Sequence, residues 1–266
     1  MAALRSVRQA LHGAWAPALE HLASRKHEAA VFLVSGAAWA LLLARHARSE
    51  WAPLCVSPPA AGLQGIEEAI GAVSRLGIAR EAMASWALMC LAMVPVLALP
   101  MVRFVAARSF AERRALATFE FLAGSFLVWL AAGAVLLLPV LLVAAQPDLS
   151  HPLVASAAFA FAALWQLTPA RRLALQRCHR TTALAAAGWG ADRDCLGFGI
   201  AAALPCVVTC WALMLACALA FHAPAALLVA QGIAMHERAV QSPQPWRYAL
   251  ILMACALAAL ARFALA

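Results

Sequence analysis

Residues 195–235 read CLGFGIAAALPCVVTCWALMLACALAFHAPAALLVAQGIAM, and this stretch contains no Asp, Glu, Lys or Arg. It is about twice as long as the roughly 20 apolar residues that a helix needs to cross a bilayer. The stretch therefore predicts two consecutive membrane helices rather than one. His222, Ala223 and Pro224 form the only plausible turn between them.

Four sulfur-containing side chains recur along the first of these two helices. Cys206, Cys210, Met214 and Cys217 are separated by four, four and three residues, which places them on one helix face. Thiolate and thioether groups are soft ligands, so the stripe predicts a site for a soft metal, with copper(I) as the first candidate. Cysteine is also a small residue that lets membrane helices approach closely. Packing without a metal is therefore the alternative interpretation of the same stripe.

The composition indicates an integral membrane protein. Of the 266 residues, 65% are hydrophobic and 12% are charged, and the mean hydropathy is +0.84, whereas soluble domains carry about 25% charged residues. The formal net charge of +8 comes from arginines that cluster between apolar segments, which indicates orientation in a membrane rather than nucleic-acid binding. Most of the cysteines lie within apolar segments, which argues against a disulfide framework. We expect the lipid bilayer as a partner and no nucleic acid.

The hydropathy pattern predicts an all-α fold, a polytopic transmembrane bundle of about seven spans, or about six if the last segment does not cross fully. Residues 1–28 are expected to form a basic, amphipathic N-terminal arm. Residues 29–266 are expected to form a single transmembrane domain with an external loop at 45–81. The expected spans are 29–44, 82–102, 121–145, 153–167, 196–221, 225–241 and 248–266.

The arginines also predict the orientation of the spans. They follow the second and fourth spans and flank the connection between the last two, whereas the loops 146–152 and 222–224 hold no Lys or Arg. Cytoplasmic loops of membrane proteins carry the excess of these residues. We therefore expect a cytoplasmic N-terminus. The abundance of alanine and arginine is typical of a GC-rich bacterial genome, so the expected location is a bacterial inner membrane. The loop 45–81 opposes this assignment mildly, because it holds four arginines beside four acidic residues.

Two further groups of candidate ligands lie on other spans. Met89 and Met93 are one turn apart on the second span, where Pro95 removes a backbone hydrogen bond and is expected to kink the helix. His236 and Glu237 lie roughly 17 Å into the sixth span, near the middle of a hydrocarbon core about 30 Å thick. Ionisable side chains at that depth are costly and usually functional. The alternatives are that the methionines only fill space and that the histidine and glutamate mark the cytoplasmic edge of a shallower helix.

A count along each span brings these groups to a similar depth. Met93, Cys210 and His236 each lie eleven residues from the outer end of their span. We therefore predict that the second, fifth and sixth spans pack around one metal site. Its candidate ligands are Met89, Met93, Cys206, Cys210, Met214, His236 and Glu237. Cys178 and His179, in the arginine-rich loop after the fourth span, either receive metal from a carrier or are incidental.

Three stretches together resemble a known family. They are residues 89–95, with two methionines before a proline; residues 166–178, where Gln-Leu-Thr-Pro is followed by two arginines and a cysteine; and residues 206–214, where two cysteines run into Trp-Ala-Leu-Met. The pattern is similar to that of the bacterial family of predicted metal-binding integral membrane proteins, whose function is undefined. The resemblance implies that the chain binds a metal. Members commonly carry a methionine where this chain has Ala92 and a cysteine where it has Thr209.

The leading hypothesis is a polytopic membrane protein that binds copper(I), either to transport it or to deliver it to a membrane metalloenzyme. The main alternative is a structural or accessory subunit of a larger membrane protein complex, with the sulfur residues used for packing. A membrane enzyme that uses the metal for redox chemistry is a third hypothesis. The sequence favours a protein that is not an enzyme, because it has no phosphate-binding loop, dinucleotide fingerprint, haem-attachment motif or serine nucleophile elbow.

Overall fold

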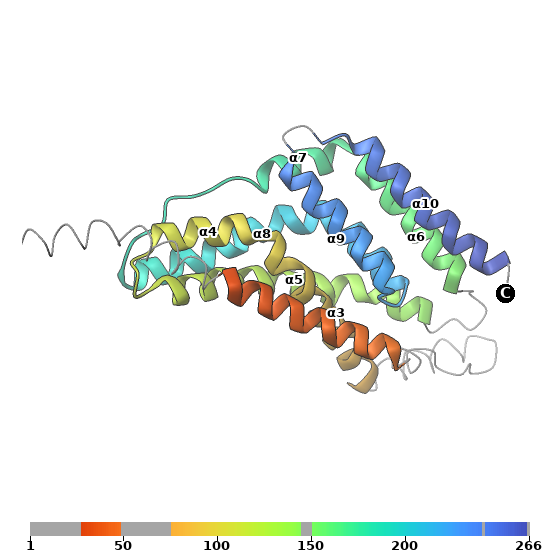
Figure 1. Cartoon of the computed structure of the whole chain (residues 1–266), viewed down its shortest axis with the longest axis horizontal. Coiled ribbons are helices and arrows are strands. Elements are labelled where there is room, and N and C mark those ends of the chain that lie inside the picture. Colours follow the sequence, from red (N-terminus) through yellow and green to blue (C-terminus); the bar gives the residue numbers. More distant parts are fainter. Residues whose placement is uncertain (1–27, 49–75, 145–150, 241–242, 265–266) are drawn as a thin grey trace, which may run out of the picture.

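The computed structural model describes residues 28–48, 76–144, 151–240 and 243–264, and every regular element in these ranges is a helix. The all-α prediction is therefore confirmed for the described residues. Along the chain the helices are Glu28–Ala47, α3 (Leu76–Leu97), α4 (Leu99–Arg108), α5 (Arg114–Ala144), α6 (His151–Gln166), α7 (Pro169–Arg177), α8 (Gly188–Leu219), α9 (Pro224–Ala239) and α10 (Pro245–Ala264) (Figure 1).

Four of the described helices are long and apolar enough to cross a membrane, and a fifth candidate arises if α6 and α7 count as one bent span. The predicted number of about seven is not confirmed. The sixteen residues of α9 extend only roughly 24 Å at 1.5 Å per residue, which is short of a hydrocarbon core about 30 Å thick. The apolar part of α10 is also shorter than a full span.

The predicted turn between the two helices of the charge-free stretch is confirmed, because α8 ends at Leu219 and α9 begins at Pro224. Other boundaries differ from the prediction. Helix α8 begins at Gly188, well before the predicted start, and the predicted span 82–102 is divided at Ala98 between α3 and α4.

Much of the polar part of the chain lies outside the described residues. This applies to the predicted N-terminal arm up to residue 27 and to most of the predicted external loop 45–81. The two ends of that loop are helical instead. Arg45, at the end of the first described helix, forms an ion pair with Glu81 near the start of α3.

The break between α6 and α7 follows from two residues. The Thr168 hydroxyl caps α7 by accepting a hydrogen bond from the backbone N–H of Arg171 at 3.4 Å, and Pro169 takes the first helical position, where its missing N–H costs nothing. A proline also disfavours helical backbone in the residue before it, so α6 cannot continue through this point. The two helices meet at 71°.

Helix α5 packs more extensively against α8 than any other pair of described helices, and α6 packs along α10 (Figure 1). Helix α9 contacts both α8 and α3. Two glycines allow the close approach of α5 and α8. A Cβ atom on Gly124 would collide with the backbone oxygen of Leu196, and one on Gly199 would collide with the backbone oxygen of Phe121. Small residues at helix crossings serve this purpose in membrane proteins.

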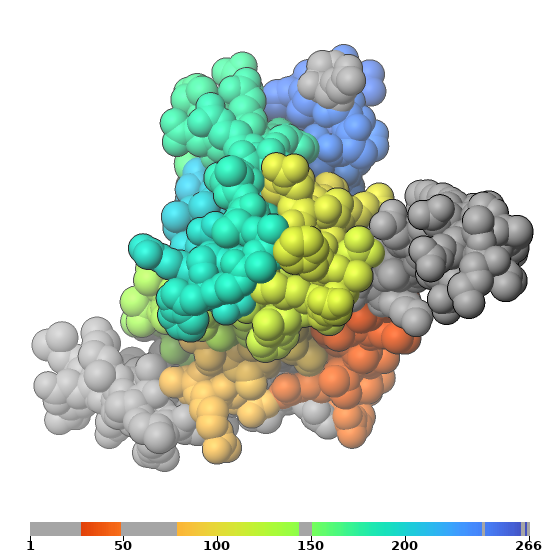
Figure 2. Space-filling model, turned by 90° about the vertical axis from the view of Figure 1, so that its left-hand side faces the viewer, coloured from red at the N-terminus to blue at the C-terminus, as the bar shows by residue number. Residues whose placement is uncertain are grey.

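The buried apolar side chains form two clusters. The larger one joins α3, α5, α6, α8, α9 and α10 and contains most of the buried cysteines. The smaller one lies where α4 packs on α5 and on the first half of α8, with the rings of Phe104 and Phe198 5.7 Å apart. Figure 2 shows this end of the molecule, with α4 in yellow beside the start of α8 in teal.

We expect Gly199→Ala to lower the free energy of unfolding by about 1–3 kcal/mol, because the added methyl group overpacks the α5–α8 crossing. The matched control is Gly197→Ala in the same helix, where a Cβ would meet no heavy atom within 4 Å. That change should be neutral or stabilising by about 0.5–1 kcal/mol, since alanine favours a helix over glycine. Unfolding of both variants in detergent micelles provides the measurement, and equal stabilities would contradict the close crossing.

Candidate metal centre

Cys206 and Cys210 lie one turn apart on the buried face of α8, with exposed fractions of 6% and 8%. We call these two residues the α8 thiol pair. The hydroxyl of Thr209 donates to the backbone oxygen of Cys206 at 2.8 Å and lies 3.5 Å from the sulfur of Cys210. The predicted spacing therefore places both thiols in the protein interior, with the Thr209 hydroxyl beside the sulfur of Cys210.

A guanidinium group adjoins the first of these thiols. Arg238, near the end of α9, donates from Nη2 to the sulfur of Cys206 at 2.8 Å and from Nη1 to the backbone oxygen of Leu97 at 2.8 Å. Leu97 is the last residue of α3, so its carbonyl group has no partner within its own helix. Arg238 therefore joins three helices and brings a permanent positive charge to the sulfur of Cys206.

A buried ion pair lies on the other side of the thiol pair. Arg171 of α7 and Glu237 of α9 each expose 3% of their side chains and form a direct ion pair. Arg171 also donates from Nε to the backbone oxygen of Thr209 at 3.2 Å. Buried charges of this kind are tolerated only when they are paired and hydrogen-bonded. The pair therefore fixes α7 and α9 against the part of α8 that carries the thiols.

The bend between α6 and α7 brings a third thiol to this region. Cys178 caps the end of α7, is 8% exposed, and its sulfur lies 4.0 Å from the hydroxyl of Thr209. The sequence left open whether this cysteine is incidental. In the structure it is buried beside the same threonine that contacts the sulfur of Cys210.

The other predicted ligands are placed differently. Met89, Met93 and Met214 are buried in the same large apolar cluster as the α8 thiol pair. His236 faces outward from α9, and its Nδ1 forms a hydrogen bond of 2.7 Å with the hydroxyl of Tyr248. Glu237 is engaged by Arg171. Within the described ranges, no three His, Cys, Asp or Glu side chains are arranged so that they could hold one metal ion.

Sequence reasoning missed the roles of Arg171 and Arg238. Each stands in a group of arginines or beside a predicted helix end, a position that predicts only a loop charge that orients the spans. The predicted position of Glu237 deep in the membrane could have indicated such a role, since a carboxylate at that depth needs a cationic partner. The partner is Arg171, and its neighbour in the sequence, Arg172, stays exposed.

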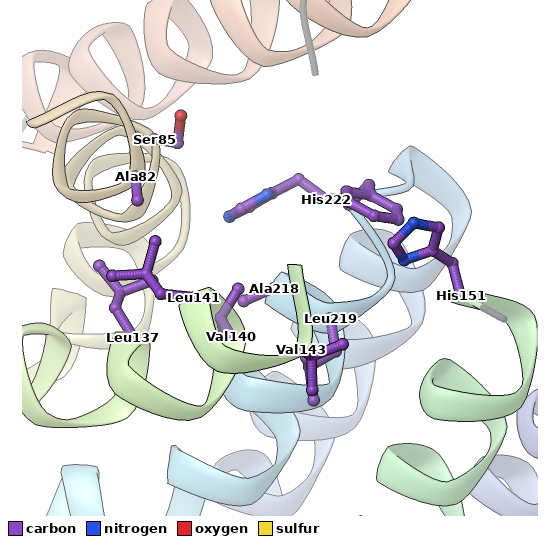
Figure 3. A pocket seen from close by; sticks show the side chains of 11 residues that line it. Ala82, Ser85, Leu137, Val140, Leu141, Val143, His151, Ala218, Leu219 and His222 are labelled. Atoms are coloured by element: carbon purple, nitrogen blue, oxygen red, sulfur yellow. The ribbon is translucent and has the colours of Figure 1, made fainter. Parts of the chain in front are cut away.

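A second polar feature follows the C-terminal end of α8. Phe221 and His222 form the turn to α9 with φ angles of 51° and 54°, a left-handed conformation that is uncommon for residues other than glycine. The His222 ring points into a cavity of about 20 Å³ toward Ser85 of α3, whereas the His151 ring packs against Phe221 with centroids 4.8 Å apart (Figure 3). Burial and the positive charge of Arg45 lower the pKa of His222 to about 4.

The fold and this centre together define a class of protein. It is an all-helical chain with several helices of membrane-spanning length, and its core holds a pair of thiols beside a guanidinium group. Thiol sulfur is a soft donor that prefers copper(I), zinc or iron–sulfur clusters over hard cations. The donor set therefore fits a soft metal ion and, with two thiols near each other, suits the low coordination numbers of copper(I).

Comparison with known proteins identifies the family. The profile of PpoB2, described as a copper chaperone, matches residues 83–262, from α3 to α10. The chain belongs to this copper chaperone family, which bears out the metal-related part of the resemblance seen in the sequence. No curated protein and no solved structure matches the chain.

We expect Glu237→Gln to destabilise the protein by about 3–5 kcal/mol, because it leaves the buried guanidinium group of Arg171 without its counter-charge. Unfolding in detergent micelles by heat or denaturant measures the loss. Arg103→Gln is the control, since Arg103 pairs with Glu28 at 2.8 Å while exposing 56% of its side chain. That pair should contribute no more than about 1 kcal/mol. Similar losses in the two variants would contradict a special role for the buried pair.

Proposed function

We propose that this chain is an integral membrane protein that binds copper(I) through Cys206 and Cys210 and delivers it to a membrane metalloenzyme. The observation that carries the proposal is the hydrogen bond of 2.8 Å from the Arg238 guanidinium group to the sulfur of Cys206 in the buried α8 thiol pair. Membership of a copper chaperone family supports copper as the cargo. The apolar helices of membrane-spanning length support delivery within a membrane.

The charge at the centre suits a copper(I) complex of two thiolates. Such a complex carries one net negative charge, which would be costly to bury alone. The guanidinium group of Arg238 supplies a positive charge at hydrogen-bonding distance of one sulfur. Arg238 therefore compensates the metal–thiolate complex, whereas a pair of neutral packing cysteines needs no such neighbour.

The bacterial inner membrane and a cytoplasmic N-terminus belong to this proposal as predictions. The burial of Arg171 and the sulfur contact of Arg238 reduce the number of arginines that act as loop charges. Exposed arginines remain in α4 and α7, among them Arg108, Arg172 and Arg177. Their positions still favour a cytoplasmic N-terminus.

The double change Cys206→Ser and Cys210→Ser tests the proposed function. We expect the parent protein, purified in detergent under anaerobic conditions, to retain about one copper(I) ion per chain, and the variant to lose at least about nine-tenths of it, because hydroxyl groups are poor ligands for soft ions. Elemental analysis and competition with a chromogenic copper(I) chelator provide the measurements.

Cys255→Ser is the control for that experiment, because Cys255 is half-buried on α10, outside the α8 thiol pair. It should bind copper as the parent does. If the double variant folds and binds as much copper as the parent, the cysteines serve for packing. The accessory-subunit hypothesis would then replace copper delivery.

Thr209→Cys should strengthen copper(I) binding by at least about tenfold, or about 1.4 kcal/mol. The hydroxyl that it replaces lies 3.5 Å from the sulfur of Cys210 and 4.0 Å from that of Cys178, so a sulfur at this position adds a soft donor to the thiols. Thr209→Ser, which keeps the hydroxyl group, is the matched control and should bind as the parent does. Equal affinities of the two variants would show that position 209 does not face the bound metal.

A further inference from the structure

A small cavity lies beside Cys206 and is lined by residues of α3, α4, α5, α8 and α9 and by the end of α7. Its volume is about 30 Å³, which exceeds the roughly 10–15 Å³ that a single water molecule requires. Its polar and sulfur-bearing lining residues are Met101 of α4, Ser125 and Trp129 of α5, Cys178 at the end of α7, Cys206 of α8 and Arg238 of α9. We call this space the Arg238 cavity. It can hold one small ion.

The two thiols that line this cavity come from different elements. Cys206 belongs to α8, and Cys178 stands at the end of α7, which the ion pair between Arg171 and Glu237 fixes in place. Cys210 does not line the cavity, although the hydroxyl of Thr209 links it to Cys178 at 3.5 Å and 4.0 Å. Cys206 therefore has one possible partner along its own helix and another across the cavity.

The surroundings of the cavity suit a metal–thiolate complex. The guanidinium group of Arg238 contacts the sulfur of Cys206 and also lines the cavity. Met101 contributes a thioether, a second kind of soft donor. The buried indole N–H of Trp129, another lining residue, makes no hydrogen bond within the part of the chain that the structure describes. This environment combines soft donors with positive charge and lacks the carboxylates that hard cations prefer.

We propose that Cys178 is a further copper ligand, which takes copper(I) from Cys210 and holds it with Cys206 in the Arg238 cavity. This inference rests on the proposed function and adds a second position for the same ion. The exchange forms a bond from copper to the sulfur of Cys178 and breaks the bond to the sulfur of Cys210. The proton that Cys178 loses is regained by Cys210, with the hydroxyl of Thr209 between them, and copper stays in the +1 state throughout.

The arrangement favours two thiols at a time over a closed site of three. No three such side chains among the described residues are arranged to hold one ion together. Cys206 is common to both positions, so the ion keeps one ligand while it exchanges the other. A chaperone needs this property, because an ion that always keeps one thiolate can move without being released into water.

Single and double cysteine variants of the full-length protein in detergent test the proposal, with copper(I) supplied anaerobically and a chromogenic copper(I) chelator as competitor and acceptor. We expect Cys178→Ser to bind copper within about threefold of the parent but to release it to the chelator at least about tenfold more slowly. Cys210→Ser should still bind copper, and X-ray absorption should find sulfur ligands around it. The double variant of Cys178 and Cys210 should bind at least about tenfold more weakly than Cys210→Ser alone. Cys255→Ser again serves as the control.

A protein without copper in the Arg238 cavity and a protein without copper at the α8 thiol pair give different results. If Cys210→Ser binds no copper while Cys178→Ser releases it at the parental rate, the cavity holds no copper, although the α8 thiol pair still does. Equal binding by Cys210→Ser and the double variant of Cys178 and Cys210 leads to the same conclusion. If the double variant of Cys206 and Cys210 binds copper as the parent does, the proposed function itself fails.

Discussion

The buried ion pair between Arg171 and Glu237 is the contact on which the arrangement of the candidate centre depends. Each side chain exposes only 3% of its surface, so neither charge can be satisfied by water, and each needs the other. Arg171 also holds the backbone oxygen of Thr209, which adds α8 to the contact. Because Cys178 ends the same helix as Arg171, and Arg238 follows Glu237 directly, the pair places both groups at the cavity that Cys206 also lines. A change in this pair would therefore move the thiol of α7 and the guanidinium group of α9 together.

The fold was predictable where a pattern had one physical explanation. The charge-free stretch 195–235 could only be two helices with a turn near Pro224, and the structure has that turn. The number of spans was not predictable from hydropathy, because a short apolar helix packed in a protein looks like one that spans lipid. Helix α9 has this ambiguity. The break at Thr168 and Pro169 was visible in the sequence, but its angle of 71° depends on packing against α8.

Some residues of the candidate centre could be predicted from the sequence, and others could not. Cys206 and Cys210 could be found because a helix of known period places residues four apart on one face, and the structure buries both. Cys178 could not be assigned, since it is 28 residues before Cys206 in the sequence and reaches the thiols only through the bend before α7. Arg238 was ambiguous for another reason. An arginine at the end of a membrane helix usually faces the aqueous side, and only the tertiary structure shows that this one turns back to a sulfur atom.

If the chain delivers copper as proposed, a site that is not closed around the ion is an advantage. A closed cage of several thiolates binds a soft ion strongly, and each ligand must be displaced before the ion can leave. Here two thiols lie one turn apart on α8, the Thr209 hydroxyl lies near the sulfurs of both Cys210 and Cys178, and the fixed charge of Arg238 would compensate a metal complex of any pair that includes Cys206. The guanidinium group of arginine stays charged over the physiological pH range, so this compensation does not depend on a proton. In the proposed function, a copper–thiolate pair would therefore stay stable in the core while the choice of the second thiol is left open, and that open choice would allow the ion to move.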